Sequence, residues 1–403
     1  MKDFFTLLKR EFKLFFSNTT LLSVFFLAPI VYALLIGATY KQGKVTDIPV
    51  ILVNNDQTPT SQQLVDMLED NSSIKILKYA QEPANLKDEV IKTEAAAVVI
   101  IPDRFEAMML QQKYPEVNVY VNTANVLTAN FATKALQLTL GTFSAGAEMK
   151  GLQKKGMNAE QAATKYEPFK ANYITMFNTT SNYLIFMWPG MMAVVLQQVI
   201  LLAMAVSFSE EFKRASFIRE YSGKERYTIL IMLIKCLPIW LLSIINVLMF
   251  YAVSKYFMIP APDNLSQFFI GTFLFVLACT NLGVLVSILI PNALKATQIL
   301  MVIASPAFII SGFTWPRYAM PPFIEGLTNI IPLTPYLETL KIMLIQNGSS
   351  YLNQPYINHL LIMALVYFVL GWIALKLKIG FLFKRFSKNK EVEIQETSTD
   401  VPE

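Results

Sequence analysis

Six long apolar runs constrain the fold of this chain more than any other feature of its sequence. A helix that crosses a bilayer needs about 20 consecutive, mostly apolar residues. Runs of about that length lie within residues 20–39, 183–207, 229–253, 267–290, 296–313 and 357–377. Because lipid offers no partner to unpaired backbone groups, such runs have to form helices. The sequence therefore predicts an α-helical integral membrane protein with six transmembrane helices.

The overall composition agrees with a membrane protein that also carries a polar part. Of the 403 residues, 54% are hydrophobic and 16% are charged, whereas soluble domains have roughly 25% charged residues. The net charge of +5 is too small to indicate a nucleic-acid partner, and we expect none. Cys236 and Cys279 both lie in apolar runs, so we expect no disulfide framework. His359 is the only histidine, so we expect no metal site.

Basic residues in the short loops orient the six spans. Lysines and arginines cluster before the first span, between the second and third spans, and after the sixth span. In a six-span topology these three segments fall on one side, which the positive-inside rule makes cytoplasmic. The loop 256–266 carries no lysine or arginine and would face outward. We therefore expect a multi-pass protein of the bacterial cytoplasmic (inner) membrane with both termini in the cytoplasm.

We interpret residues 1–19 as a cytoplasmic helix that lies in the headgroup layer. Apolar side chains recur there near helical spacing, against three basic residues. The apolar positions are Phe4, Phe5, Leu8, Phe12, Phe15 and Phe16. This pattern is typical of an interfacial helix. The alternative is an N-terminal extension of the first span. At the other end of the chain, we interpret residues 379–403 as a cytoplasmic tail.

Residues 40–182, between the first and second spans, have the pattern of a small α/β domain. Short β-branched runs at 48–54, 74–79, 95–101 and 117–123 alternate with helical stretches at 60–70, 83–94, 104–112 and 126–155. This alternation predicts a mainly parallel sheet in an inserted extracytoplasmic α/β domain between helices 1 and 2. Asp56, Asp103 and Glu106 are better explained as helix caps or solvated residues than as catalytic carboxylates. No glycine-rich phosphate loop follows any strand, so we expect a binding or gating module.

Several stretches of the sequence, in their order and spacing, resemble a known family. They are KREF at 9–12, VNNDQTPTSQQLVDML at 53–68, AAAVVIIPDRFEAMM at 95–109, and SGFTWPRYAMPP at 311–322 followed by IPLTPYLETLK at 331–341. Over nearly its whole length the chain resembles permease subunits of ATP-binding-cassette exporters, in the type 2 permease family with a large extracytoplasmic domain.

The resemblance implies that a cytoplasmic nucleotide-binding ATPase subunit couples to this chain. The inner loop 208–228 stands where the family has its coupling helix. The candidate coupling residues are Arg10 and Glu11 near the N-terminus, and Glu210, Glu211, Phe212, Lys213 and Arg214 in the loop. Ala215-Ser216 replaces the family's usual Gly-Thr pair, which leaves the contact residues open. The alternative is that the loop carries only the basic charge that orients the spans.

The resemblance also implies that the proline-rich segment 314–347 is re-entrant and forms an exit gate. Two half-helices, broken at Pro321-Pro322 and at Pro332, would dip into the outer leaflet and turn back, which is tolerated where protein buries them. The gate residues are Trp315, Pro316, Pro321, Pro322, Pro332, Pro335 and Tyr336, with Trp315, Tyr318 and Tyr336 as interfacial anchors. The alternative is an ordinary loop with an interfacial helix at 335–346.

The chain contains no Walker A pattern, G-x-x-x-x-G-K-[ST]. We therefore expect no enzymatic activity and no cofactor in this chain, with ATP and Mg bound by the partner subunit. Six spans are usually half a transporter in the family, which implies a second permease copy or a paralogue in a homo- or heterodimer. Whether a periplasmic adaptor takes part stays open.

The leading functional hypothesis is export of an amphiphilic or hydrophobic substrate out of the cytoplasm or the inner leaflet, driven by the partner's ATP hydrolysis. Gln197, Gln198, Asn246 and Asn281 are candidates for the substrate pathway. Hydrogen bonds between helices explain these four residues equally well. The alternative function is a membrane-anchored extracytoplasmic binding or assembly protein without transport activity, against which six spans count. A channel would need a filter motif or rings of charge, and the sequence shows neither.

Overall fold

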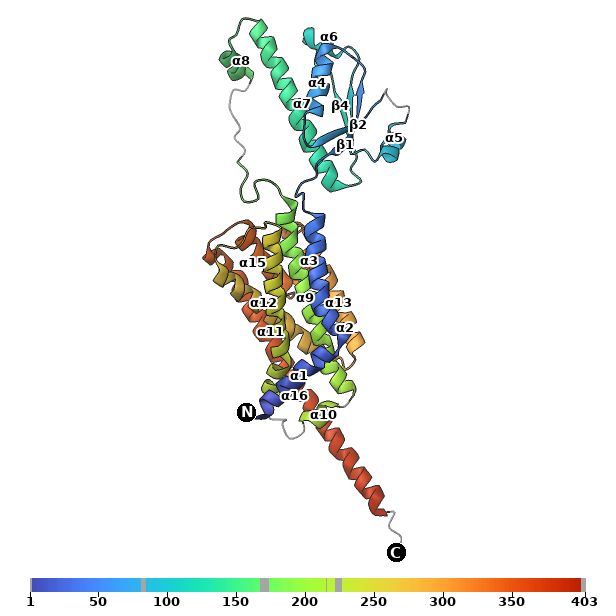
Figure 1. The fold of residues 1–403 in the computed structure, drawn as a ribbon, viewed down its shortest axis with the longest axis vertical. Helices are drawn as coiled ribbons and strands as arrows, with labels where there is room; N and C mark the ends of the chain where they lie inside the picture. Colours follow the sequence, from blue (N-terminus) through green and yellow to red (C-terminus); the bar gives the residue numbers. More distant parts are fainter. Residues whose placement is uncertain (1, 81–84, 167–173, 215, 222–226, 400–403) are drawn as a thin grey trace. The chain divides into compact units, whose positions relative to one another are not determined.

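The structure, a computed structural model, describes residues 2–80, 85–166, 174–214, 216–221 and 227–399, and it divides into two compact units (Figure 1). Unit 1 comprises Met1–Gly43 and Thr175–Glu403, and unit 2 comprises Lys44–Ile174. In the described part of the chain, six helical segments are long and apolar enough to cross a membrane. They are Thr19–Thr39, Tyr183–Lys213, Thr228–Tyr256, Leu265–Leu289, Ala293–Ile310 and Ser350–Phe381. Each one covers most or all of a predicted span.

The first span is preceded by a separate helix, α1 (Lys2–Ser17). The chain leaves the helical conformation at Asn18, whose side-chain oxygen accepts a 3.0 Å hydrogen bond from the backbone N–H of Leu21. Asn18 therefore caps the helix that follows, as asparagine commonly does. Residues 2–17 thus form a helix that is separated from the first span at Asn18, and its place in the headgroup layer stays a prediction.

The first span itself contains one wide turn. It consists of α2 (Thr19–Leu22), the π-helical turn η1 (Ser23–Leu27) and α3 (Ala28–Thr39). Pro29 stands at the start of α3, where its ring lacks an N–H and would crowd the carbonyl of the residue four places earlier. A π-turn is one of the ways in which a helix accommodates such a break.

In unit 1, the remaining spans pack around α9 (Tyr183–Lys213). This helix contacts α3, α11 (Thr228–Tyr256), α12 (Leu265–Leu289) and α13 (Ala293–Ile310), while α16 (Ser350–Thr399) packs on α12. Close approach of α12 to α9 depends on Gly283, because a Cβ there would come within 2.6 Å of the Met204 Cβ. Such small-residue contacts are typical of helix packing in membranes.

The proline-rich segment forms short helices, not a loop. A 3₁₀ turn, η3 (Arg317–Ala319), precedes α14 (Pro322–Thr328), and α15 (Leu333–Leu340) continues into the π-turn η4 (Lys341–Ile345). At about 1.5 Å per residue, α15 and η4 together measure roughly 20 Å, and a hydrocarbon core is about 30 Å thick. Prolines stand at the first turn of α14 and at the start of α15, where proline is tolerated. α14 adds a second short helix, while α15 with η4 nearly coincides with the helix at 335–346 of the alternative, so the re-entrant path stays a prediction.

Unit 2 is an α/β fold on a four-stranded sheet. The strands are β1 (Ile48–Asn54), β2 (Ile74–Tyr79), β3 (Ala97–Ile101) and β4 (Asn118–Val121), in the order β2-β1-β3-β4. β1 pairs in parallel with both β2 and β3, whereas β4 is antiparallel to β3. All four strands were predicted; the sheet is mixed because β4 returns antiparallel at one edge.

The helices of unit 2 also follow the predicted pattern. They are α4 (Pro59–Glu69), α5 (Leu86–Thr93), α6 (Phe105–Leu110), α7 (Val126–Lys154) and α8 (Ala159–Tyr166). Residues from α4, α6 and α7 form one core with one face of the sheet, and residues from α5 pack against the other face. The sheet is therefore covered on both sides, as a parallel arrangement requires.

The carboxylates of unit 2 that could have suggested catalysis hold helix starts in place. The Asp56 carboxylate accepts a 3.1 Å hydrogen bond from the backbone N–H of Glu106, and the Glu106 carboxylate accepts one of 2.5 Å from the Thr60 hydroxyl. Asp103 accepts a 2.9 Å bond from the Arg104 N–H. Of the three, Asp56 binds a backbone N–H in the first turn of α6, as a capping residue does, whereas Glu106 binds only a side-chain hydroxyl.

Candidate functional site

Four charged side chains meet where α1, α9 and α11 approach one another. Arg10 of α1 lies 2.8 Å from a carboxylate oxygen of Glu211 on α9 and 2.9 Å from one of Glu11. The Lys235 ammonium on α11 lies 3.0 Å from the other oxygen of Glu211 and 3.2 Å from the other oxygen of Glu11. We refer to Arg10, Glu11, Glu211 and Lys235 as the charge junction.

The charge junction is almost completely withdrawn from the surroundings. Glu11 is 8% exposed, Glu211 is 6% exposed and Lys235 is 3% exposed. Two positive and two negative side chains give a formal charge of zero, which is the arrangement that makes burial of charges tolerable. Lys235 gains further contacts, since its ammonium donates to the Ser207 carbonyl at 3.4 Å and lies 5.1 Å from the centre of the Phe208 ring.

The periodicity of α1 brings Glu11 into the junction. Leu7, Glu11 and Phe15 follow one another at intervals of four and lie buried on one face of α1. Phe5 and Phe16 stay exposed on other parts of the helix surface. The buried stripe packs α1 against α11, and Glu11 is the single acidic residue within that stripe.

The short helix α10 (Ser216–Tyr221) adds Tyr221 to the junction. Its hydroxyl donates a 3.3 Å hydrogen bond to Glu11, and its ring lies 4.8 Å from that of Phe217, which in turn lies 4.9 Å from that of Phe212 on α9. Burial, together with the neighbouring Glu11 carboxylate, raises the pKa of Tyr221 well above its ordinary value. Tyr221 therefore stays protonated, and its hydroxyl donates a hydrogen bond to the Glu11 carboxylate.

The electrostatics of Arg10 agree with this arrangement. Burial by itself would lower the pKa of the Arg10 guanidinium, but the carboxylates of Glu211 and Glu11 outweigh it and raise the pKa. Arg10 is thus fully charged at any physiological pH. Its guanidinium therefore supplies a cation that holds the two carboxylates of the junction in place.

A hollow lies next to the charge junction. It is lined by the junction residues together with Leu14, Asn18 and Leu21 on the first helices, Ser207 and Glu210 on α9, and Pro238 on α11. One side of the junction therefore faces open space and not packed side chains.

The predicted coupling residues divide into two groups. Arg10, Glu11 and Glu211 belong to the buried charge junction. Glu210, adjacent in sequence to Glu211, forms an exposed pair with Arg214 at 3.2 Å, and Lys213 is exposed. Phe212 belongs with the buried side: its ring stacks with that of Phe208 and lies under the ammonium of Lys378.

Lys235 was not predicted as a site residue. A lysine inside an apolar run needs a partner of opposite charge. The acidic residues nearest the inner ends of the spans, Glu11 and Glu211 among them, were the available candidates. A lysine inside an apolar run, together with these acidic residues, could therefore have predicted that Lys235 pairs with Glu11 and Glu211.

The predicted pathway residues have mixed surroundings. The Asn246 amide donates to the Phe25 carbonyl at 3.0 Å, and the Asn281 amide donates to the Ala364 carbonyl at 2.9 Å. Gln197 is buried beside Cys279, with 4.0 Å between its side-chain oxygen and the sulfur, and Gln198 is half-buried. Asn246 and Asn281 thus form the helix-to-helix hydrogen bonds of the alternative explanation, and a role in the pathway stays a prediction.

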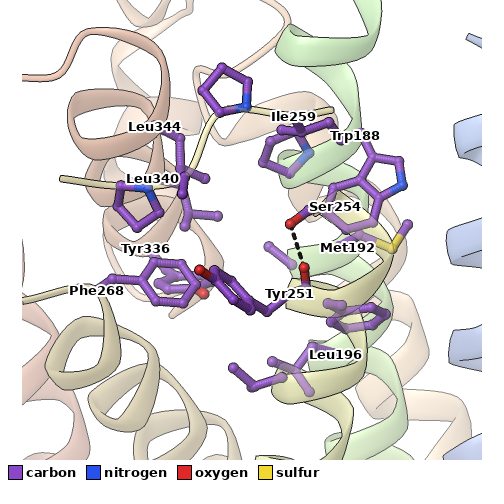
Figure 2. Close-up of a pocket in the computed structure, with 17 residues that line it drawn as sticks. Trp188, Met192, Leu196, Tyr251, Ser254, Ile259, Phe268, Tyr336, Leu340 and Leu344 are labelled. Atoms are coloured by element: carbon purple, nitrogen blue, oxygen red, sulfur yellow. Dashed lines mark hydrogen bonds between the residues drawn. The ribbon is translucent and has the colours of Figure 1, made fainter. Parts of the chain in front are cut away.

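The predicted gate residues also separate into exposed and buried positions. Trp315 and Tyr318 are exposed, and Pro316, Pro321, Pro322, Pro332 and Pro335 flank or begin the short helices. Tyr336 differs from the expected interfacial anchor, because it is buried. Its ring stacks on Phe275 at 4.1 Å and its hydroxyl lies 3.0 Å from that of Thr272. Tyr336 instead lines an apolar cavity within unit 1 (Figure 2).

The sequence model of the family described as "ABC-2 family transporter protein" matches residues 19–376. The chain is similar to the probable multidrug ABC transporter permease YbhS of Escherichia coli K12, with 24% identity over 193 residues, and this match covers 47% of the chain and 51% of YbhS. The chain thus spans about half the length of that relative. It is also similar to the probable multidrug ABC transporter permease YbhR of the same organism, with 18% identity over 307 residues, covering 76% of the chain and 80% of YbhR.

Proposed function

The chain belongs to the ABC-2 transporter family, and from this premise we propose that it is the membrane-spanning permease subunit of an ATP-binding-cassette exporter. In this role it moves an amphiphilic or hydrophobic molecule out of the cytoplasm or the inner leaflet. ATP is hydrolysed by a separate subunit, since the sequence has no Walker A pattern of its own. Two similar proteins, YbhS and YbhR, are both named as probable multidrug permeases, which supports a cargo of this class.

The charge junction is the observation that carries this proposal. It ties α1 to α9 and α11 through ion pairs of 2.8 to 3.2 Å, and the 3.3 Å hydrogen bond from Tyr221 to Glu11 adds α10 to this contact. Pulling one partner away would leave an uncompensated buried charge, which costs about 3–5 kcal/mol. A force applied to α1 or α10 is therefore transmitted to the two spans and not absorbed by a loose contact.

The central position of α9 explains how such a force reaches the bundle. α9 runs through unit 1 and contacts α3, α12, α13 and α15. A shift at its Glu211 end changes its packing against all four helices. Closure of an ATPase subunit against the Glu211 end would in this way favour one arrangement of the spans over another, which is what alternating access needs.

The arrangement of unit 1 supports the proposed orientation. α1, α10 and the C-terminal part of α16 lie at one end of unit 1 (Figure 1). The basic segments before the first span, after the second and after the sixth are therefore gathered together, in agreement with a single cytoplasmic face. On this orientation unit 2 is extracytoplasmic.

The exposed residues next to the junction are the proposed contact with the ATPase subunit. Glu210, Lys213 and Arg214 follow directly on α9 and remain accessible. Arg10, Glu11 and Glu211 lie behind them and transmit the movement. A second permease copy or paralogue would complete the transporter.

Reconstitution tests the proposed function. The chain is co-purified with its ATPase subunit, inserted into vesicles, and supplied with ATP and a fluorescent amphiphile. We expect ATP-dependent movement of the amphiphile by the complex, and no ATP hydrolysis by the purified chain alone. A complex that hydrolyses ATP without moving any amphiphile would favour the alternative of a membrane-anchored binding or assembly protein.

A further inference from the structure

A second cavity of unit 1 lies apart from the charge junction. It is open on one side and lies between α9, α11, α15 and the loop 257–262, with Phe268 of α12 also in its wall. Figure 2 shows Phe268 and Tyr336 on one side of the cavity, facing Trp188 and Met192 on the other. None of the charge-junction residues lines this cavity.

Three polar side chains in the cavity wall have hydrogen-bond partners of their own. The Trp188 indole N–H donates to the Ala33 carbonyl at 3.1 Å. The Ser254 hydroxyl donates to the Tyr251 carbonyl at 2.8 Å, as Figure 2 shows, and the Tyr336 hydroxyl pairs with Thr272. Buried water needs two to four polar partners, and these groups offer few. A ligand with many polar groups would lose its own hydrogen bonds on entering.

Rigid side chains keep the cavity from collapsing. The Trp188 ring meets Phe250 edge-on at 6.3 Å, and Tyr336 is fixed by its stack on Phe275. Three prolines add stiffness, Pro189 from α9 and Pro260 and Pro262 from the loop. An empty space held open in this way loses the dispersion contacts that its wall atoms would otherwise make.

We propose that this cavity holds one acyl chain of a membrane phospholipid. Acyl chains are the apolar molecules that surround a protein with membrane-spanning helices, and a hydrocarbon chain passes from lipid to an apolar wall without hydrophobic cost. Inside the cavity the chain restores the missing dispersion contacts. Its headgroup stays outside, so no polar group has to be buried. The inference requires only that the six helices span a membrane, and it holds whether or not the chain exports anything.

A photoreactive lipid tests this site. The full-length protein is placed in vesicles of dioleoyl phosphatidylcholine that contain a minor share of phosphatidylcholine with a diazirine near the methyl end of one acyl chain. After irradiation, labelled peptides are identified by mass spectrometry. We expect label on Tyr336 and Leu340, which are each 4% exposed and out of reach of bulk lipid, as well as on the exposed Leu365. Label on Leu365 with none on residues 336–344 would overturn the proposal.

Variants that fill the cavity provide the matched control. Ala193→Trp, and independently Val247→Phe from the opposite wall, should remove label from residues 336–344 while leaving Leu365 labelled. Ala252→Trp adds the same bulk to an exposed position of α11 and should change neither signal. Persistent label on residues 336–344 in a filled variant that folds, judged by its thermal unfolding, would also overturn the proposal. If neither filled variant folds, the presence or absence of label on residues 336–344 of the unsubstituted protein decides whether the proposal holds.

Discussion

The side-chain amide of Asn246 donates a 3.0 Å hydrogen bond to the main-chain carbonyl of Phe25. The helical donor for that carbonyl would be the residue four places on, which is Pro29 and has no N–H. Phe25 lies in the π-turn η1, and an apolar bundle disfavours any carbonyl that is left without a donor. Asn246 on α11 therefore repairs the gap that proline leaves in the first span, and it joins the two helices in doing so.

Replacing Asn246 should therefore destabilise the protein in a way that depends on Pro29. We expect Asn246→Leu to lower the free energy of unfolding by about 1 kcal/mol, a typical size for a hydrogen bond between membrane helices. In the Pro29→Ala background the new N–H can bond to Phe25, so the same substitution should cost less. Thermal unfolding of the four proteins in detergent measures the coupling. Equal losses in both backgrounds would contradict the repair.

The two neighbouring glutamates should respond very differently to neutralisation. Glu211→Gln leaves Arg10 and Lys235 with an excess positive charge in a buried site, and we expect a loss of about 3 kcal/mol in unfolding free energy. Glu210→Gln removes only the exposed pair with Arg214, which should cost about 0.5 kcal/mol or less. Thermal unfolding and ATP-dependent transport are measured for both. Similar stabilities for the two variants would show that the junction does not hold the helices together.

A charge-balanced double variant should recover part of what each single variant loses. Lys235→Met leaves two carboxylates facing one arginine, and Glu11→Gln leaves two cations facing one carboxylate. Lys235→Met with Glu11→Gln keeps the Arg10–Glu211 pair at 2.8 Å and restores neutrality. We expect the double variant to be more stable than the sum of the single losses predicts, by about 1–3 kcal/mol. Additive losses would argue against a coupled junction.

Local patterns in the sequence were sufficient to predict most of the architecture. The apolar runs gave the six spans, because a run of about 20 apolar residues has few alternatives. The strands of unit 2 were predicted from β-branched runs, and the α1 boundary from helical spacing. The strand β4 was predicted but its antiparallel direction was not, because strand direction depends on the path of the connecting segment and not on composition.

The candidate site was harder to predict, because its residues are far apart in the sequence. Arg10, Glu11 and Glu211 were named as surface contacts for a partner, since nothing local distinguishes Glu211 from Glu210. Their burial depends on which face of each helix meets α11, a tertiary property. Lys235 is recognisable in the sequence as the only charged residue between Ile229 and Val253. Pairing it required the three-dimensional arrangement of three helices.

The proline-rich segment should be reachable only from the outer side of the membrane. Its helices are too short to cross, so both of its ends lie on one face. Ser311 is buried and unsuitable as a probe, whereas Tyr318 is 92% exposed and Asn329 and Asn347 are also exposed. Single cysteines at these three positions, with Cys236 and Cys279 replaced by alanine, should react with a membrane-impermeant maleimide added to intact cells.

Lys213→Cys, on the exposed inner end of α9, is the matched control for that experiment. It should stay unlabelled in intact cells and react only after the membrane is opened, because the positive-inside rule places it in the cytoplasm. Mass tagging on a gel quantifies each reaction. If Asn347→Cys were labelled only after opening, the fifth and sixth spans would be inverted, and with them the proposed position of unit 2 outside the cytoplasm.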